Sequence, residues 1–355
     1  KLPRFPNIKY GIRVGPVSQI LEPYPHMLIA PQSCQRHCKG IRLVKKNATT
    51  LRGVFCPTIT PFDDQLNPDK TRFVQHCHRV LEEGCHGLAV FGTTGEANSL
   101  SVEERMMLLD ELVESGIDGS VIVPGTGCAA LTDSVRLTEH AVQLGCSSVL
   151  MLPPFYYKDV GDDGLFRAFA EVIERVSEET LKIYLYHIPP VSGVPLDLPL
   201  VERLADTYPN CVVGLKDSSG EWPYTAALLK SRPGFGAFSG SEVFLRNNLT
   251  AGGCGTITAV ANVNSSAIRA AYDGFQAEDG EELQSAITRR REIIQTQPMI
   301  PALKSIIATI TGDENWRRVR PPLEPLSVGQ TNSLVEALSS DGFSPLSRVC
   351  SVSRP

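Results

Sequence analysis

Short apolar segments alternate with longer amphipathic segments from residue 53 onward, and this alternation limits the possible folds more than any other feature. The apolar segments lie at 54–59, 87–91, 121–125, 148–152, 182–187, 212–216, 236–239 and 254–259. Their continuous apolar character predicts strands buried on both faces, as in a parallel sheet. Amphipathic helices are predicted between and after them, at 70–83, 101–115, 132–144, 162–177, 197–207, 222–230, 243–251 and 264–278. Ser101, with Glu104 three residues later, has the spacing of a capping box and marks one helix start.

Eight strand–helix units in roughly 225 residues have the size of a (β/α)8 TIM barrel. A doubly wound open sheet would carry a glycine-rich phosphate-binding turn after its first strand. Here the first strand runs into Thr58-Ile59-Thr60-Pro61-Phe62 instead. After residue 279 only helical segments follow, at 281–296, 300–311 and 328–341. We therefore expect an α/β barrel at 53–278, a C-terminal helical extension at 279–345 and a tail at 346–355.

The first 52 residues differ in charge from the rest of the chain. They hold ten of the 34 Lys and Arg residues but one of the 39 acidic residues, which leaves 24 basic against 38 acidic side chains, or −14, for residues 53–355. That acidic balance argues against a nucleic-acid partner. The basic leader, residues 1–52, is interpreted as a disordered or artefactually translated segment, with an organelle presequence as the alternative. No apolar run is long enough for a membrane span, so we expect a cytoplasmic protein, or an imported one if the leader is a presequence.

The ten cysteines form no Cys-x-x-Cys pair and lie mostly in apolar runs, which predicts free thiols in a reducing compartment. The triplet His76-Cys77-His78 suggests a metal site at first sight. In a helix, however, successive side chains point in different directions. No metal is expected there.

Polar residues at the carboxyl ends of the predicted strands are the candidates for chemistry, because barrel enzymes hold their active sites there. Lys216 ends the sixth strand, where apolar surroundings disfavour the charged amine and favour attack on a carbonyl. A strand that simply ends in a solvated lysine is the alternative. Tyr186 ends the fifth strand, one repeat earlier, so it should lie beside Lys216 at a similar height. A phenol there can carry the protons of imine chemistry, although an aromatic core residue is the alternative.

The segment Gly92-Thr93-Thr94-Gly95-Glu96 follows the second strand. Its glycines permit a tight turn whose N–H groups and hydroxyls can bind a carboxylate, with a plain loop as the alternative. Tyr157 adds a phenol at the same rim. Gly240 after the seventh strand and Ile257 in the eighth complete a predicted ring around one pocket.

In this combination the chain resembles the dihydrodipicolinate synthase and N-acetylneuraminate lyase family of class I, pyruvate-using aldolases. The resemblance covers roughly residues 53–345 and rests on TITPF (58–62), GTTGE (92–96), PPFYY (153–157), YHIP (186–189), GLKDSSG (214–220), FSGSE (238–242) and GTITAVAN (255–262).

The resemblance implies specific roles at these positions. Lys216 would be the Schiff-base lysine and Tyr186 the proton-shuttling tyrosine. Thr93 and Tyr157 would be relay partners, with Tyr157 serving a neighbouring subunit. Thr94 would bind the pyruvate carboxylate, and backbone groups at Gly240 and Ile257 would line the pocket. The family needs no metal or organic cofactor, and its members are commonly tetramers built from dimers, so a homo-oligomer is expected.

Two departures bear on the substrate. Dihydrodipicolinate synthases carry an arginine for the carboxylate of aspartate semialdehyde where this chain has Val191. Sialic-acid lyases carry an acidic pair for sugar hydroxyls where this chain has Glu242 and Val243. We therefore expect pyruvate plus an uncharged aldehyde, as in a 2-keto-3-deoxy sugar acid or a related hydroxy-keto acid. The alternatives are 4-hydroxy-tetrahydrodipicolinate synthesis and a non-catalytic barrel that binds a keto acid. His187, which follows Tyr186, is expected to be structural.

Overall fold

A computed structural model describes residues 50–343, and its strands form one parallel sheet. The strand order is β2-β1-β7-β6-β5-β4-β3. The strands are β1 (Gly53–Cys56), β2 (Gly87–Leu88), β3 (Ser148–Met151), β4 (Lys182–His187), β5 (Val212–Asp217), β6 (Gly236–Ser239) and β7 (Gly255–Ile257).

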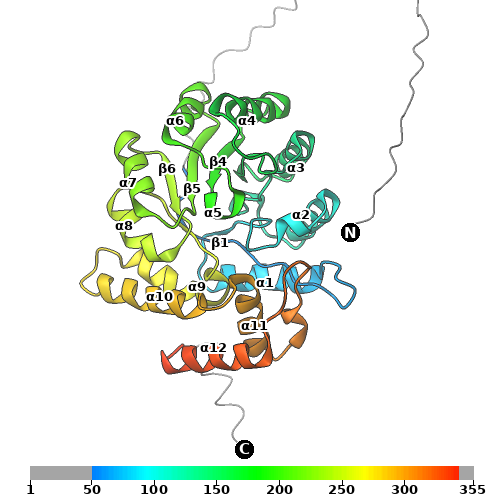
Figure 1. Ribbon diagram of the computed structural model, residues 1–355, viewed down its shortest axis with the longest axis vertical. Helices are drawn as coiled ribbons and strands as arrows, with labels where there is room; N and C mark the ends of the chain where they lie inside the picture. Colours follow the sequence, from blue (N-terminus) through cyan, green and yellow to red (C-terminus); the bar gives the residue numbers. More distant parts are fainter. Residues whose placement is uncertain (1–49, 344–355) are drawn as a thin grey trace, which may run out of the picture. The chain divides into compact units, whose positions relative to one another are not determined.

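Helices surround this sheet and alternate with its strands along the chain (Figure 1). They are α1 (Lys70–Glu82), α2 (Val102–Glu114), α3 (Leu131–Gln143), α4 (Asp162–Val176), α5 (Pro189–Ser192), α6 (Leu198–Thr207), α7 (Trp222–Ser231), α8 (Leu245–Thr250) and α9 (Ala261–Asp273). Three more, α10 (Gly280–Ile294), α11 (Met299–Thr311) and α12 (Val328–Ser340), follow the last strand. The short 3-10 helices are η1 (Ala97–Ser99), η2 (Gly119–Val121), η3 (Glu242–Phe244) and η4 (Glu314–Arg317).

Apolar side chains on the two faces of the strands form two separate cores. On β4, Ile183 and Leu185 face the larger core, which lies between the sheet and the helices. Tyr184 and Tyr186 alternate with them, as the period of two in a strand requires, and face the smaller core. That smaller core consists of Phe55, Ala89, Val123, Leu150, Tyr184, Tyr186, Ile188, Phe238, Cys254 and Ile257. The predicted burial of both strand faces is confirmed.

The segment expected as a third strand, 121–125, differs from the prediction. Asp118 caps a 3-10 turn that includes Val121, so the extended part begins only at Ile122. Pro124 has no N–H to donate, and the segment makes isolated bridges instead of a ladder. Backbone hydrogen bonds from Val123 N to Leu88 O (2.7 Å) and from Leu150 N to Pro124 O (2.9 Å) still connect it to both edges of the sheet.

Most of the remaining long elements match the predicted ranges to within a few residues, but α9, predicted at 264–278, begins three residues earlier and ends five residues earlier. Ser101 forms the predicted capping box with Glu104. The short helix α5 was not predicted, because four residues carry no periodic signal. Most of the leader and the whole tail lie outside the described residues. Residues at the end of the expected leader already contact the sheet, since Leu51 N donates to the hydroxyl of Tyr184 at 2.9 Å.

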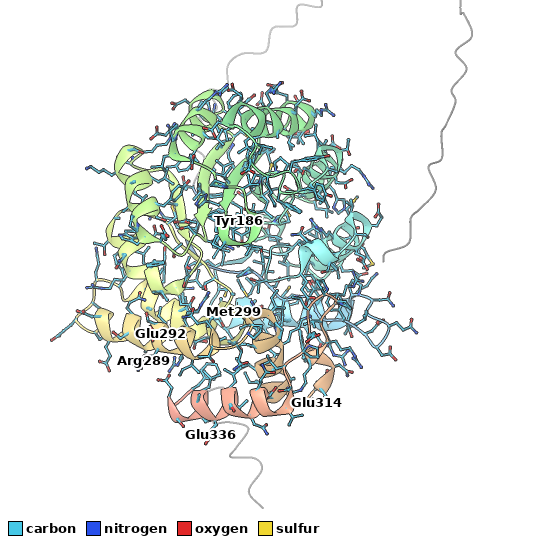
Figure 2. All side chains as sticks on the ribbon, viewed as in Figure 1. Tyr186, Arg289, Glu292, Met299, Glu314 and Glu336 are labelled. Atoms are coloured by element: carbon cyan, nitrogen blue, oxygen red, sulfur yellow. The ribbon has the colours of Figure 1, made fainter. Side chains whose placement is uncertain are left out.

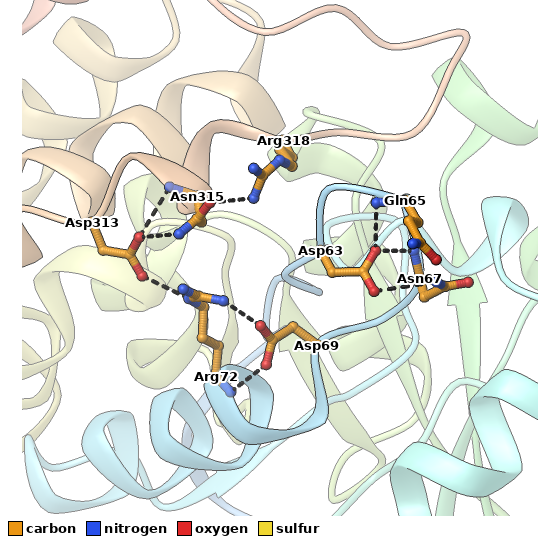
Figure 3. A network of polar contacts seen from close by, with 8 residues as sticks. All are labelled: Asp63, Gln65, Asn67, Asp69, Arg72, Asp313, Asn315 and Arg318. Carbon is orange, nitrogen blue, oxygen red and sulfur yellow. Dashed lines mark hydrogen bonds and ion pairs between the residues drawn. The ribbon is translucent and has the colours of Figure 1, made fainter.

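The C-terminal helices pack on one side of the α/β unit. Helix α11 contacts α9 and η4, and α12 contacts α10 and α11. Figure 3 shows one connection from this region to α1, where Arg72 pairs with Asp313 (2.6 Å) and with its helix cap Asp69. Within residues 50–343, none of the helices is both long and apolar enough to cross a membrane.

Candidate active site

Tyr186 and Lys216 are direct register partners on the adjacent strands β4 and β5. Lys216 Nζ lies 3.3 Å from the phenolic oxygen of Tyr186 and 4.3 Å from the centre of its ring. Both residues are buried, with 4% and 3% of their surface exposed. Tyr186 lies inside the ring of helices (Figure 2). The prediction that these two side chains meet at a similar height is confirmed.

Thr93 extends this pair to a third residue. Its hydroxyl lies 3.3 Å from the phenolic oxygen of Tyr186. The turn that carries Thr93 is held by bonds from Gly95 N to Gly92 O (3.1 Å) and from the Thr60 hydroxyl to Gly95 O (2.7 Å). A Cβ atom on Gly95 would lie 2.7 Å from Thr58 O, so only glycine lets the turn pack this closely against the first strand's loop.

The surroundings of Tyr186 favour its ionised form. Burial by itself raises the pKa of this phenol. The positive charge of Lys216 and hydrogen bonds to Thr93, Lys216 and Ser218 outweigh burial, so the pKa of Tyr186 lies below its usual value of 10. A phenol in this position can give up and recover a proton more readily than an ordinary tyrosine.

Ser218 is a site residue that the sequence analysis missed. Besides contacting Tyr186, its hydroxyl occupies the space where a Cβ atom on Gly240 would lie. Gly240 N donates to Asp217 O at 2.6 Å, which brings the loop after β6 against the end of β5. The available signal was spacing, because residues two apart on an extended chain share a face, and Ser218 is two residues beyond Lys216.

His187 and Asp217 end the same two strands but face away from Tyr186. The ring of His187 stacks on Tyr224 with 4.1 Å between centroids, and its Nδ1 accepts from Leu196 N at 3.0 Å. Burial lowers the pKa of His187. Asp217 accepts hydrogen bonds from Ser219 N (2.8 Å) and from the Thr225 hydroxyl (2.5 Å). Both side chains therefore have structural roles.

The other predicted site residues fall into two groups. Ile257 is buried at the end of β7, and Thr94 is half-buried in the turn beside Thr93. Tyr157 and Val191, in contrast, have 73% and 63% of their surface exposed. No hydrogen bond joins Tyr157 to Thr93 or Tyr186 among the described residues. The structure therefore brings Lys216, Tyr186 and Thr93 together and leaves Tyr157 and Val191 at the surface.

Glu242 is held away from solvent at the start of η3. One of its carboxylate oxygens accepts from the Thr258 hydroxyl and lies 3.4 Å from Arg291 Nη1. Its side chain is fully buried, and the other oxygen has no partner among residues 50–343. A contact from Glu242 to a sugar hydroxyl would require it to leave both partners.

The His76-Cys77-His78 triplet has other partners. His76 is buried between Asn262 and Arg79, Cys77 is buried in the apolar core, and His78 contacts Ser115. Across the described part of the chain, no group of three or more His, Cys, Asp or Glu side chains is arranged to hold a metal ion.

Residues 50–341 match the model of the Dihydrodipicolinate synthetase family. The chain is 35% identical over 278 residues to an uncharacterized DapA-like lyase of Chloroflexus aurantiacus, which covers 78% of this chain and 92% of the relative. The crystal structure of dihydrodipicolinate synthase from Agrobacterium tumefaciens is 33% identical with a TM-score of 0.75, and covers 81% of this chain and 98% of that one. A Sulfolobus solfataricus 2-keto-3-deoxygluconate aldolase variant shares the fold at 21% identity, with a TM-score of 0.74 over 84% of this chain and 98% of that one.

Proposed function

The chain belongs to the dihydrodipicolinate synthetase family, and on that basis we propose that it is a pyruvate-dependent class I aldolase or lyase that works through a Schiff base. The observation that carries this proposal is the contact series Lys216–Tyr186–Thr93, in which the buried Lys216–Tyr186 pair meets the half-buried Thr93, with 3.3 Å between successive polar atoms. A protein that only binds a keto acid needs no buried amine beside a phenol. Members of the family include aldolases and lyases, which agrees with this chemistry.

Lys216 is the nucleophile in this mechanism. The neutral Nζ attacks C2 of pyruvate, the C–N bond forms, and the ketone oxygen leaves as water once it has received two protons. The product is a protonated imine. Loss of a proton from the methyl carbon gives an enamine, whose carbon attacks the aldehyde carbonyl. In the reverse direction the same intermediates cleave a 2-keto-4-hydroxy acid, and water then releases pyruvate from Lys216.

Tyr186 moves the protons for these steps, because its oxygen lies within reach of Lys216 Nζ and its pKa is lowered. Thr93 accepts or supplies the proton on the far side of Tyr186. The Thr94 hydroxyl and the N–H groups of Thr93 and Thr94 bind the pyruvate carboxylate, which fixes the reacting carbon toward the aldehyde. Backbone groups at Gly240 and Ile257 line the same pocket.

The aldehyde partner is uncharged, so the substrate is a 2-keto-3-deoxy sugar acid or a related hydroxy-keto acid. Support comes from Val191, which has neither charge nor donor on the exposed face of α5. 4-Hydroxy-tetrahydrodipicolinate synthesis is the second candidate, favoured by the identity to the Agrobacterium tumefaciens enzyme.

The finer architecture is part of the same proposal. Residues 122–125, the third predicted strand, join the seven strands of the sheet and close a (β/α)8 barrel at 53–278. Residues 279–345 form its C-terminal helical extension. The protein assembles as a homo-oligomer in which the exposed Tyr157 reaches a neighbouring subunit's site. The leader, residues 1–52, lies outside the catalytic unit except at its end, where Leu51 contacts Tyr184. The catalytic unit works without a metal or organic cofactor.

Incubation with pyruvate followed by borohydride reduction tests the reaction. We expect the mass of one reduced pyruvate adduct on the peptide that contains Lys216, and no adduct in Lys216→Ala. The matched control is Lys230→Ala, which removes an exposed lysine near the end of α7 and should leave the adduct unchanged. No adduct in the unmodified protein, or an adduct that persists in Lys216→Ala, would overturn the proposal. Pyruvate release from a panel of 2-keto-3-deoxy acids then identifies the substrate.

A further inference from the structure

A buried ion pair joins the Thr93 turn to the C-terminal helices. Glu96 ends the Gly92–Glu96 turn, and Lys304 lies in α11, 208 residues later in the chain. Lys304 Nζ lies 2.5 Å from Glu96 Oε1, and both side chains are completely buried. Burial lowers the pKa of Lys304 to about 8 despite the opposing charge of Glu96.

Further contacts hold both members of this pair. The second carboxylate oxygen of Glu96 accepts from Arg320 N at 2.9 Å. Lys304 Nζ also donates to Arg318 O at 2.7 Å and lies 4.4 Å from the centre of the Phe62 ring. Both carboxylate oxygens of Glu96 are therefore bonded to the stretch from α11 to Arg320.

Arg320 reinforces the same connection just beyond the turn. Its guanidinium donates to Ser99 O at 2.5 Å and forms a two-pronged contact with the Glu104 carboxylate. Its Nε donates to Leu66 O at 2.8 Å. Contacts from the C-terminal segment thus hold residues 96–104 in place. On the other side of the turn, the hydroxyl of Thr60 donates to Gly95 O.

A buried ion pair is an inefficient way to add stability. Taking two charges out of water costs about as much as their attraction returns, and apolar replacements of similar size are often as stable. What a fully bonded pair supplies is a fixed geometry. Geometry matters here because the Thr93–Tyr186 separation of 3.3 Å is already near the upper limit for a hydrogen bond.

We propose that Glu96 and Lys304 are positioning residues for the active site, and that the C-terminal helices hold the Thr93 hydroxyl on Tyr186 through this pair. The backbone at Glu96 supports this role, since its φ of 55° is a left-handed conformation that a non-glycine residue adopts only when its surroundings hold it there. The expected loss of kcat rests on the proposed function, whereas the expected loss of the Thr93–Tyr186 contact does not.

The double variant Glu96→Gln/Lys304→Met tests the proposal, because it removes both charges and keeps the size of each side chain. We expect the melting temperature to stay within a few degrees and kcat to fall by about 10- to 100-fold, the usual effect of a lost hydrogen bond to a charged group. The matched control is Asp313→Asn, which breaks the ion pair between η4 and Arg72 without touching the turn (Figure 3). It should retain kcat.

A second readout does not depend on turnover. The Thr93 hydrogen bond contributes to the lowered pKa of Tyr186, so the Tyr186 signal in an absorbance titration should move to higher pH in the double variant. The Tyr186→Phe variant identifies that signal by its loss. The positioning role would be overturned if the Tyr186 phenol ionised at an unchanged pH in the double variant, if kcat did not change, or if Asp313→Asn lost as much kcat. If the double variant does not fold, the same titration on Glu96→Gln alone decides. Failure of pyruvate trapping in the unmodified protein would overturn the proposed function and leave this titration as the test of the pair.

Discussion

The phenolic oxygen of Tyr186 lies 3.3 Å from both Lys216 Nζ and the Thr93 hydroxyl, so a single oxygen connects an amine from β5 to a turn after β2. Each group alone has an ordinary structural explanation. Together they form a path along which one proton can pass from the buried amine to the half-buried turn.

Tyr186→Phe removes only this shared oxygen. The ring should still fill its place in the smaller core, so the melting temperature should change little. Turnover should fall by about 10²- to 10⁴-fold, the usual contribution of a positioned acid–base group. Steady-state kinetics beside a thermal melt provide the measurement. A variant that keeps more than half the original rate would exclude the shuttle role.

Gly240→Ala probes how tightly the pocket is built around Ser218. The added methyl group would overlap the Ser218 hydroxyl, which contacts Tyr186, and would also approach Asp217 O to 2.6 Å. We expect a loss of about 1–3 kcal/mol in stability from overpacking. We also expect kcat/KM for pyruvate to fall by about tenfold, because a displaced Ser218 loses its hydrogen bond to Tyr186. Gly161→Ala, where a methyl group meets open space, is the control. Equal kinetics in the two variants would contradict the described contact.

Because His76 is buried, we expect the folded protein to lose stability in mild acid. Arg79 donates to Nδ1 of the ring at 3.1 Å, and the other ring nitrogen lies 2.8 Å from Asn262 Oδ1. Burial and the nearby Arg79 charge lower the pKa of His76 to about 3, so the folded protein keeps the ring neutral. The unfolded chain binds the proton near pH 6.5, so stability is complete above that pH and is lost progressively from pH 6.5 toward pH 3.

The expected loss from this one residue is about 2 kcal/mol in the free energy of unfolding between pH 8 and pH 5. Urea unfolding of the unmodified protein and of His76→Gln at both pH values measures it. The variant is less stable at pH 8, but its drop between the two pH values should be smaller by about that amount. Equal drops would show that His76 is not the group responsible.

Local patterns in the sequence predicted the part of the site that depends on strand alternation. Tyr186 and Lys216 end apolar strands one repeat apart, and parallel strands in register bring such ends together. Ser218 was missed because it lies just past the strand end. The Glu96–Lys304 pair was beyond prediction, since two residues separated by 208 positions leave no periodic trace of their contact. The predicted start of the strand at 121–125 was wrong, because Asp118 caps a 3-10 turn that includes Val121.

Val191 provides the last prediction, which concerns the aldehyde. An anionic aldehyde needs a charged donor to replace part of its water shell, and arginine matches a carboxylate with two parallel N–H groups. Val191 offers neither, although its 63% exposure lets a carboxylate there keep some of its water. The penalty is therefore smaller than in a closed pocket, and we expect kcat/KM for aspartate semialdehyde to lie about tenfold below that for glyceraldehyde, each with pyruvate.

Val191→Arg should reverse this preference, because the exposed position on α5 has room for the longer side chain. Val160→Arg adds the same charge at another exposed position and should leave the preference unchanged. Lys158 and Arg167 are cations that could substitute, and Lys158 is the one tested, since its Nζ donates to Ser192 O at 2.5 Å, one residue beyond Val191. If the unmodified protein prefers aspartate semialdehyde by tenfold and Lys158→Met abolishes that preference, Lys158 replaces the arginine and 4-hydroxy-tetrahydrodipicolinate synthesis becomes the function.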